Sequence, residues 1–240
     1  MTDRVRLIQV SKKYSKLQGA KLLSHWGWWK PVEGSRWFWS LRDVSLDIRP
    51  GQTLGVIGAN GSGKTTLLRI ITGVTDPTHG TVIVNGKVVS LLEIFAGMHA
   101  ELTGRENIYL NGIILGMRQQ EIRRKFDAIV EFAGIENFLE MPLKHYSTGM
   151  MMRVGFSVAM HVEADIVLVD ESWSIGDQSF QAKSLRRLAE LQQRGAALVL
   201  VTHDLEIIRK HTQQTLWLDQ GNVAALGPTA EVTRTYAQKT

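Results

Sequence analysis

Two features common in other chains are missing here. The sequence has no cysteine, and none of its apolar runs approaches the ~20 residues that a membrane-spanning helix needs. The lack of cysteine excludes a disulfide framework and cysteine-ligated zinc. The first four residues, Met-Thr-Asp-Arg, do not begin a signal peptide. With 240 residues, 44% of them hydrophobic, the chain can bury a full α/β core, and we expect one compact cytosolic domain.

The net charge of +5 raises the question of a nucleic acid partner. The basic residues are dispersed, however, and form only small clusters such as 123–125 and 186–187. A solvated helix face explains each cluster equally well, and anionic lipid headgroups nearby would explain the overall excess. We therefore expect no nucleic acid partner.

The pattern G-x-x-x-x-G-K-[ST] runs from Gly58 to Thr65. The apolar run 53–57 before it predicts a buried strand, and residues 66–71 after it predict a helix. Glycines let backbone N–H groups turn toward phosphate oxygens, and the helix N-terminus adds partial positive charge. We expect Lys64 to reach the β- and γ-phosphates of a nucleoside triphosphate, and the Thr65 hydroxyl to ligate Mg²⁺. The nucleotide-binding candidates in this loop are Gly58, Asn60, Gly61, Ser62, Gly63, Lys64, Thr65 and Thr66.

Two later apolar runs predict buried parallel strands that end in polar residues. Residues 166–169 are followed by Asp170 and Glu171, and residues 198–202 are followed by His203. Ligands of open α/β sheets bind beyond the carboxyl ends of such strands. Asp170 is suited to the Mg²⁺ shell, and Glu171 to polarising the water that attacks the γ-phosphate.

With Tyr-Ser-Thr-Gly-Met at 146–150, these motifs resemble, in this order, the ATP-binding cassette (ABC) ATPases. The commonest form of that family's signature is Leu-Ser-Gly-Gly-Gln, so Ser147 and Gly149 match it and the other three residues depart from it. The resemblance implies an α/β P-loop NTPase cassette with a parallel-sheet core, a small antiparallel β-subdomain and a helical subdomain near 95–160. It also implies that His203 contacts the γ-phosphate and that Asp177 is the acid of the D-loop.

In this family the signature faces the phosphate loop of another subunit. The resemblance therefore implies a head-to-tail homodimer, or paired cassettes, with two ATP molecules and Mg²⁺ between the subunits. Ser147, Thr148 and Gly149 would then lie against the other subunit's ATP. Tyr14 stands where the family stacks an aromatic ring on adenine, although a near-surface tyrosine in an edge strand is the alternative. The family's Q-loop glutamine is missing. Counting back from residues 103–108 puts its place near Glu93 or Ile94, with Glu93 a candidate polar substitute and Mg²⁺ ligand.

Residues 91–112, the form Tyr-Ser-Thr-Gly-Met-x-Met-Arg at 146–153 and Ile-Gly-Asp at 175–177 look like the ATPases of bacterial polysaccharide exporters. The resemblance covers nearly the whole chain and is closest to the O-antigen type, with capsule and teichoic acid exporters as alternatives. It implies a homodimer bound to an ABC-2-type membrane permease in a complex of two permeases and two ATPases. That complex would move a lipid-linked polysaccharide, and this chain would lie at the cytoplasmic face of the bacterial inner membrane.

Two further expectations concern the limits of this resemblance. Some O-antigen members carry a C-terminal carbohydrate-binding domain, and we expect none within residues 1–240, which we assign to a single ABC ATPase domain. The rival from another class is a soluble ABC ATPase acting on ribosomes or nucleic acid. Such proteins usually fuse two cassettes or insert a coiled coil or a zinc module, and the sequence has none of these features.

Residues 15–40 form an unusually long connection after Tyr14. Five of the seven tryptophans fall in it, namely Trp26, Trp28, Trp29, Trp37 and Trp39. Tryptophan suits a boundary between apolar and wet surroundings, so one hypothesis is that residues 22–40 meet the permease or lipid headgroups. The alternative is that these rings cover the β-subdomain of the cassette itself.

Periodicity and turn residues predict the remaining elements. We expect strands near 5–10, 41–48, 81–84 and 215–219, and a hairpin turn at 219–222. We expect mostly helix over 104–160, with breaks near Gly134 and Pro142, and helices over 181–194 and 228–237.

Overall fold

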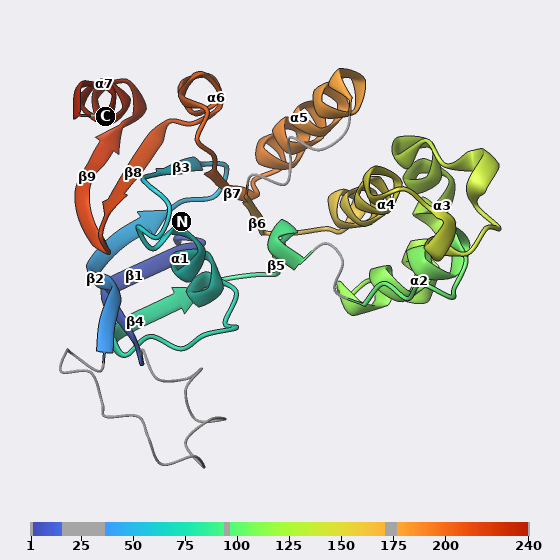
Figure 1. Cartoon of the computed structure of the whole chain (residues 1–240), viewed down its shortest axis with the longest axis horizontal. Coiled ribbons are helices and arrows are strands. Elements are labelled where there is room, and N and C mark those ends of the chain that lie inside the picture. Colours follow the sequence, from blue (N-terminus) through green and yellow to red (C-terminus); the bar gives the residue numbers. More distant parts are fainter. Residues whose placement is uncertain (1, 16–36, 94–96, 171–176, 240) are drawn as a thin grey trace, which may run out of the picture.

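The structure is a computed structural model that describes residues 2–15, 37–93, 97–170 and 177–239. Two sheets lie in one part of the molecule, and a lobe of helices lies to the side of them (Figure 1). The larger sheet has the strand order β5-β6-β7-β3-β8-β9, and the smaller sheet has the order β2-β1-β4. The strands are β1 (Val5–Ser15), β2 (Trp37–Ile48), β3 (Thr53–Ile57), β4 (His79–Val84), β5 (Val88–Ser90), β6 (Ile166–Val169), β7 (Ala197–Val201), β8 (Gln214–Asp219) and β9 (Asn222–Pro228).

Strands β3, β6 and β7 are the core of the larger sheet. Every residue in them is buried, which explains why their sequences are apolar throughout rather than alternating. Strands β3, β5, β6, β7 and β8 run parallel to one another. Strand β9 follows the turn at 219–222 and pairs with β8 as the antiparallel edge strand of the sheet. The sheet thus combines a parallel core with one hairpin.

The smaller sheet is antiparallel and buries one face. Val5 and Leu7 of β1 and Leu46 and Ile48 of β2 point inward, while the residues between them are exposed. These side chains share one hydrophobic cluster with helix α1 (Lys64–Ile71) and with β3. Helix α1 is therefore packed between the two sheets, which fixes the loop that precedes it.

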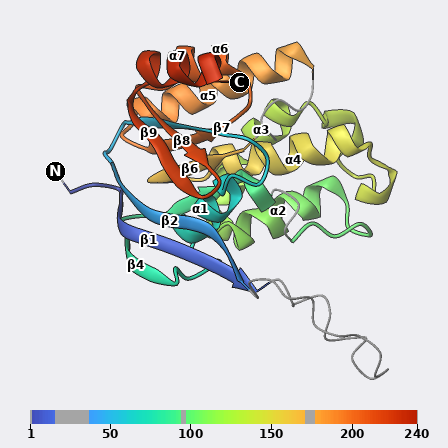
Figure 2. The same ribbon diagram turned by 60° about the vertical axis from the view of Figure 1, so that its left-hand side comes forward.

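Three helices form the separate lobe, α2 (Gly104–Ile114), α3 (Gln119–Ala133) and α4 (Thr148–His161) (Figures 1 and 2). Helix α2 begins with a capping box. The Glu106 N–H donates to Thr103 Oγ1 at 3.2 Å, and the Thr103 N–H donates to Glu106 Oε2 at 2.8 Å. The remaining helical elements are α5 (Gln178–Gln193), α6 (Leu205–His211), α7 (Thr229–Lys239) and the 3₁₀ turns η1 (Leu91–Glu93), η2 (Glu136–Phe138) and η3 (Leu143–His145). Among the helices of the described ranges, none combines the length and apolarity that crossing a membrane requires.

Most of the predicted elements are confirmed, including the strand at 53–57, the helical stretch 104–160 with its breaks, and the turn at 219–222. The boundaries of the tryptophan-rich connection were wrong at both ends. Strand β1 continues to Ser15 and β2 begins at Trp37, because these two strands pair with each other beyond the predicted ranges. Only residues 16–36 lie between them, outside the described residues. Strands β5 and β9 and helix α6 were not predicted.

Candidate nucleotide-binding site

The loop between β3 and α1 has the backbone that its glycines predict. Gly58 has a φ of 145° and Gly63 a φ of 111°, both in the region that L side chains rarely adopt. A Cβ on Gly58 would lie 2.2 Å from Leu218 O, and one on Gly63 would lie 2.4 Å from Ser40 O. Strands β8 and β2 thus press against the loop from outside, and only glycine fits at these two positions.

The side chain of Lys64 is nearly buried and lies over the loop. Its Nζ donates to the carbonyl oxygens of Gly58 at 2.7 Å and Ala59 at 3.0 Å. Thr65 is exposed at the start of α1, and Thr66 shares a 2.7 Å hydrogen bond with Ser40 of β2. The first turn of α1 contains no acidic residue, so the helix N-terminus keeps its positive end toward the loop.

One buried polar atom of this loop has no partner within the described part of the chain, namely Ser62 Oγ. Ser62 itself is 3% exposed. Its backbone is well held, because Ser62 N–H donates to Ala59 O at 3.1 Å and Gly221 N–H donates to Ser62 O at 3.0 Å. A buried hydroxyl usually has a hydrogen-bond partner, so this atom fits a loop that binds a polar ligand.

The sheet order brings the three polar strand ends together. Strand β7 lies between β6 and β3, with Val169 opposite Leu200 and Val56 opposite Val201. Asp170 follows β6 directly, the phosphate loop follows β3 directly, and His203 lies just beyond the end of β7. Because the three strands are parallel neighbours, these groups converge at one edge of the sheet, as the sequence predicted.

The exposed His203 is placed by the start of α6. Asp204 is the N-cap of that helix, and its Oδ1 accepts from the N–H groups of Glu206 at 2.8 Å and Ile207 at 3.2 Å. The Asp204 N–H in turn donates to Thr202 Oγ1 at 3.1 Å. The histidine is therefore held between a buried strand and a capped helix.

The signature-like residues lie at the N-terminus of α4, in the helical lobe. Ser147 is the N-cap and its Oγ accepts from Met150 N–H at 3.2 Å; Ser147 and Thr148 are exposed and Gly149 is half-buried. Tyr146, which departs from the family pattern, is 6% exposed and its hydroxyl donates to Phe138 O at 2.6 Å. It anchors the start of α4 inside the lobe.

Asp177 has two partners that the sequence did not reveal. Its Oδ1 accepts from Phe180 N–H at 2.9 Å as the N-cap of α5, and its Oδ2 pairs with Arg153 Nη2 of α4 at 2.8 Å. The Phe180 N–H, and next the Arg153 guanidinium, hold the pKa of this carboxyl below its usual value. The only signal for this contact was the arginine that ends the signature form at 146–153.

Tyr14 lies near the end of β1, opposite Phe38 of β2. Their ring centroids are 5.8 Å apart, and Lys12 Nζ lies 5.2 Å from the centroid of Tyr14. The tyrosine is half-buried, which leaves both interpretations of it open. Of the other candidates, Glu171 and residues 174–176 lie outside the described residues, as does the side chain of Glu93.

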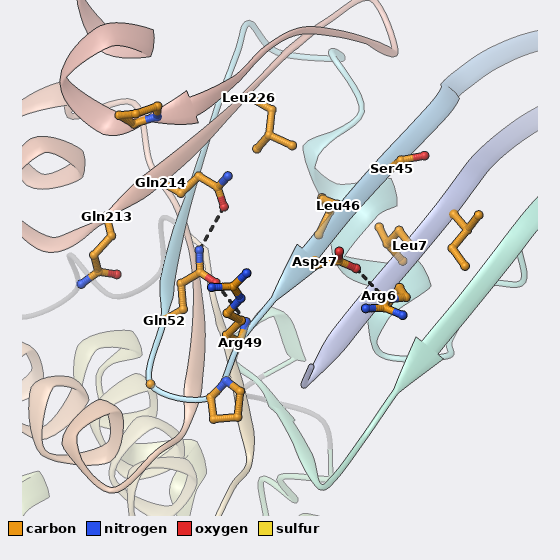
Figure 3. A pocket seen from close by; sticks show the side chains of 14 residues that line it. Arg6, Leu7, Ser45, Leu46, Asp47, Arg49, Gln52, Gln213, Gln214 and Leu226 are labelled. Atoms are coloured by element: carbon orange, nitrogen blue, oxygen red, sulfur yellow. Dashed lines mark hydrogen bonds and ion pairs between the residues drawn. The ribbon is translucent and has the colours of Figure 1, made fainter. Parts of the chain in front are cut away.

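A cleft of about 1140 Å³ lies at the other edge of the larger sheet (Figure 3). Gln52, which directly precedes β3, and Gln214, the first residue of β8, line this cleft and share a 3.0 Å hydrogen bond. Arg6 and Asp47 of the smaller sheet line its opposite wall and pair at 2.9 Å. The length of β3, five residues or about 16 Å, separates this cleft from the phosphate loop, so it is not part of the nucleotide site.

The fold, together with the sheet edge that holds the phosphate loop, Asp170 and His203, defines an α/β protein of the P-loop nucleotide-binding class. A family model described as "ABC transporter" matches residues 41–174. The O-antigen export system ATP-binding protein RfbB of Myxococcus xanthus is 43% identical over 199 residues, which are 83% of this chain and 46% of that protein. The teichoic acids export ATP-binding protein TagH of Listeria innocua is 41% identical over 199 residues, 83% of this chain and 59% of that protein. The chain therefore belongs to the ABC transporter family, and it spans about half the length of these relatives.

Solved structures agree with this assignment. A dimeric ATP-binding cassette in a post-hydrolysis state, bound to ADP and Pi, superposes with a TM-score of 0.74 at 25% identity. The match covers 94% of this chain and 98% of that one. The expected fold class, with its parallel core, antiparallel β-subdomain and helical subdomain, is confirmed.

Proposed function

We propose that this chain is the ATP-hydrolysing subunit of an ABC exporter that moves a lipid-linked bacterial surface polysaccharide, with O-antigen as the first candidate. The observation that carries the proposal is the convergence of the phosphate loop, Asp170 and His203 at one sheet edge. The named function of the relatives supports the choice of substrate class.

In this proposal the loop residues bind the phosphates of ATP. The backbone N–H groups of Gly61 and Gly63 and the ammonium of Lys64 supply positive charge, and a Cβ on Gly61 would meet no atom within 4 Å, so the loop is open on that side. Ser62 Oγ is a ready donor or acceptor for a phosphate oxygen. Tyr14 stacks on the adenine, and His203 contacts the γ-phosphate.

Two oxygen groups of the chain would hold Mg²⁺, the Thr65 hydroxyl and the Asp170 carboxylate, with Glu93 as a third candidate. Within the described ranges no cluster of three acidic, histidine or cysteine side chains is built for a metal. That suits Mg²⁺, which is usually bound through one or two protein oxygens and the phosphates of the nucleotide. When bound, the ion would neutralise charge that develops on the phosphates.

Glu171 is the proposed general base, because it directly follows Asp170 at the phosphate edge. Its carboxylate would orient and polarise the attacking water, while the loop and His203 stabilise charge on the transferred group. Catalysis would thus consist of positioning and charge stabilisation, without a covalent intermediate.

The proposed active unit is a homodimer. Ser147, Thr148 and Gly149 lie in the helical lobe rather than at the sheet edge, so they are free to act on the ATP of another subunit. The similar cassette of known structure is described as dimeric, which supports this arrangement. An ABC-2-type permease at the inner membrane would complete a complex of two permeases and two ATPases.

The tryptophan-rich segment is the proposed contact to the permease or to lipid headgroups. Trp37 and Phe38 are 49% and 46% exposed on opposite faces of β2, whereas the Trp39 ring lies 5.9 Å from that of His79 in β4. Trp39 thus matches the alternative, in which these rings cover the β-subdomain, and the other two leave apolar surface for a partner. The indoles of Trp26, Trp28 and Trp29 lie outside the described residues.

A second substrate is supported by one observation. TagH is nearly as similar to this chain as RfbB, which makes teichoic acid the alternative cargo. To separate the two substrates, this chain and its permease would be expressed in a host that lacks its own permease. The export of O-antigen and of teichoic acid would then be measured.

The Glu171→Gln variant tests the catalytic part of the proposal. We expect it to retain ATP, lose nearly all turnover and accumulate closed dimers, because the amide cannot accept the proton of water. Glu163→Gln is a control at an exposed acid that pairs with Lys125. An active Glu171→Gln enzyme would remove Glu171 from the role of base.

A further inference from the structure

Helix α4 is held unevenly along its length. Residues 154–160 are all buried, whereas residues 148–153 are exposed or half-buried. The end that carries Ser147 and Gly149 is held by the half-buried Met150 and Met151, which pack against the hydrophobic cluster, and by a few directed polar contacts. Ser147 caps its own helix, and Tyr146 is tied to the lobe through Phe138, so neither of these contacts reaches the sheet core.

Arg153 makes a charged contact from this half of α4 to a helix outside the lobe. It lies in the second turn of α4, its Nη2 is 2.8 Å from Asp177 Oδ2, and its guanidinium lies over the ring of Phe180 at 5.3 Å. Both partners belong to the start of α5, which leads back to the parallel sheet through β7. The arginine is thus bound at its charged tip and across its planar face.

The two partners of Arg153 at the start of α5 are themselves held by ring packing and by a helix cap. Phe180 is buried, with its ring 5.5 Å from that of Phe156 in α4 and 5.6 Å from that of Phe132 in α3. Asp177 caps the helix through Phe180 N–H while it binds Arg153. At the far end of α4, Arg187 of α5 donates to Met160 O at 3.0 Å. Helix α5 therefore holds α4 at both ends.

The length of α4 turns a small tilt into a large displacement of the signature. Its 14 residues span about 21 Å, so a tilt of about 5° around the buried end moves Ser147 by about 2 Å. A misplacement of about 1 Å at a reacting centre can cost a hundredfold in rate. Building on the proposed function, we propose that Arg153 is a positioning residue, which aims the signature at the other subunit's ATP by fixing α4 to Asp177 and Phe180.

Three variants test this role in the full chain. Arg153→Ala removes the contact, Arg153→Lys keeps the charge without the planar stack, and Asp177→Asn keeps a helix-capping oxygen but loses the carboxylate charge. We expect Arg153→Ala to lower kcat about 10-fold to 100-fold. Binding of a fluorescent ATP analogue to the monomer should stay within twofold of wild type, because the monomer's own phosphate loop is untouched.

ATP-dependent dimerisation is the second readout, measured in the Glu171→Gln background. We expect Arg153→Ala to weaken the dimer at least tenfold, and Arg153→Lys to restore part of it. Because the arginine acts through Asp177, the Asp177→Asn variant should show a comparable loss, and the double variant should be no worse than either single one.

Arg105→Ala is the matched control. Arg105 also pairs with a carboxylate, that of Glu140 at 2.7 Å, and also lies over a phenyl ring, that of Phe126 at 4.9 Å. Its contacts stay inside the helical lobe, so its loss should leave kcat and dimerisation within twofold of wild type.

The outcomes separate this inference from the proposed function. A wild-type chain without ATPase activity overturns the proposed function. A hydrolysing wild type with an Arg153→Ala variant of unchanged kcat and dimer affinity overturns only the positioning role. A large loss in Arg153→Ala beside an unaffected Asp177→Asn also overturns it, because the arginine would then act directly on the nucleotide.

Discussion

At the scale of single residues, the lysine of the phosphate loop has the clearest environment. Lys64 is nearly buried, and its ammonium is held by two carbonyl oxygens of its own loop. A buried ammonium requires such partners, because an uncompensated charge in the interior is costly. The loop therefore keeps a positive charge at the point where the proposal puts the β- and γ-phosphates.

Replacing Lys64 by alanine should lower kcat/KM for ATP by about 100-fold or more, the scale seen when one preorganised donor is removed from a transition state. Steady-state ATPase assays with nucleotide-binding titrations would measure this loss. Lys144→Ala is the control, since Lys144 pairs with Glu101 at 2.7 Å on the helical lobe and should be dispensable. Wild-type kinetics in Lys64→Ala would contradict the assigned role.

His161 at the end of α4 predicts how stability depends on pH. Burial, and next the charges of Arg187 and Lys125, lower the pKa of His161, although its hydrogen bond to Ser157 O opposes this. Burial also lowers the pKa of His211. A lowered pKa in the folded state means that the unfolded chain binds more protons. The resulting stability is complete above the unfolded histidine pKa of about 6.5 and is lost as pH falls through and below that value.

We therefore expect the melting temperature to decrease as the pH is lowered from 7.5 to 5.5. His161→Gln should be less stable at pH 7.5, because it loses the edge contact with Phe132, yet its melting temperature should fall less over the same interval. Adding His211→Gln should flatten the dependence further. A slope identical to that of wild type would show that His161 does not contribute to it.

At the scale of elements, the N-terminus of α4 is a place where the needs of folding and of function can be told apart. Gly149 has helical backbone, and a Cβ there would meet only Ser147 Oγ, at an ordinary 3.9 Å. Alanine is the better helix former, by up to about 1 kcal/mol. The part of the fold that the structure describes therefore gives no reason for glycine at this position, which fits the proposal that another subunit's ATP approaches the helix here.

The Gly149→Ala variant should fold with equal or slightly higher thermal stability but lose about tenfold or more of its ATPase activity, because the added methyl group would stand toward the other subunit's ATP. Gly73→Ala is a control in which the expected effects on stability and activity are reversed. Its Cβ is unobstructed, but its φ of 74° should cost about 1 kcal/mol of stability without changing the chemistry. Full ATPase activity in Gly149→Ala would contradict a signature role for α4.

The predictable elements were those with a strong local pattern. Strands 53–57 and 166–169 are continuously apolar because they are buried on both faces, and the glycines of the phosphate loop mark positive φ angles. The missed elements carry weak signals. Strand β5 has three residues, α6 has seven, and β9 contains two alanines and ends in Gly-Pro, which are residues with little preference for strands. Their structure is imposed by neighbours in the sheet and by α7.

The positions of the site residues were predictable only where the order of the strands in the chain determines which residues lie close together. Parallel strands deliver Asp170 and His203 to the edge that holds the phosphate loop, so sequence order was sufficient there. The Arg153–Asp177 pair joins α4 of the helical lobe to the start of α5, beside the packed rings of Phe156 and Phe180, and chain order does not indicate this contact. Gly104 is similar. A Cβ on it would lie 2.2 Å from the Tyr146 hydroxyl, which no local pattern could indicate.

At the scale of the whole molecule, the chain has a nucleotide edge, a helical lobe that presents the signature, and an antiparallel sheet whose β1–β2 connection is rich in tryptophan (Figure 2). Each part is incomplete by itself in the proposed mechanism, because the signature serves another subunit and the connection serves a membrane partner. In that proposed mechanism the chain is one component of an assembly.

Deletion of residues 22–36 tests the role of the connection while leaving β1 and β2 intact. We expect basal ATPase activity within about threefold of wild type, since no residue of the phosphate edge is removed, and loss of polysaccharide export in cells. Export would be followed by surface polymer staining, and folding by thermal melts. Loss of folding would instead favour the alternative in which these rings cover the β-subdomain.

The most direct test of the central claim is the ATPase rate of the purified chain, alone and with a co-expressed candidate permease in lipid nanodiscs. The account predicts that the permease co-purifies, changes the rate, and makes it respond to a lipid-linked glycan. A chain that binds no permease, and that RNA, DNA or ribosomes stimulate instead, would contradict the export function and leave only the nucleotide chemistry.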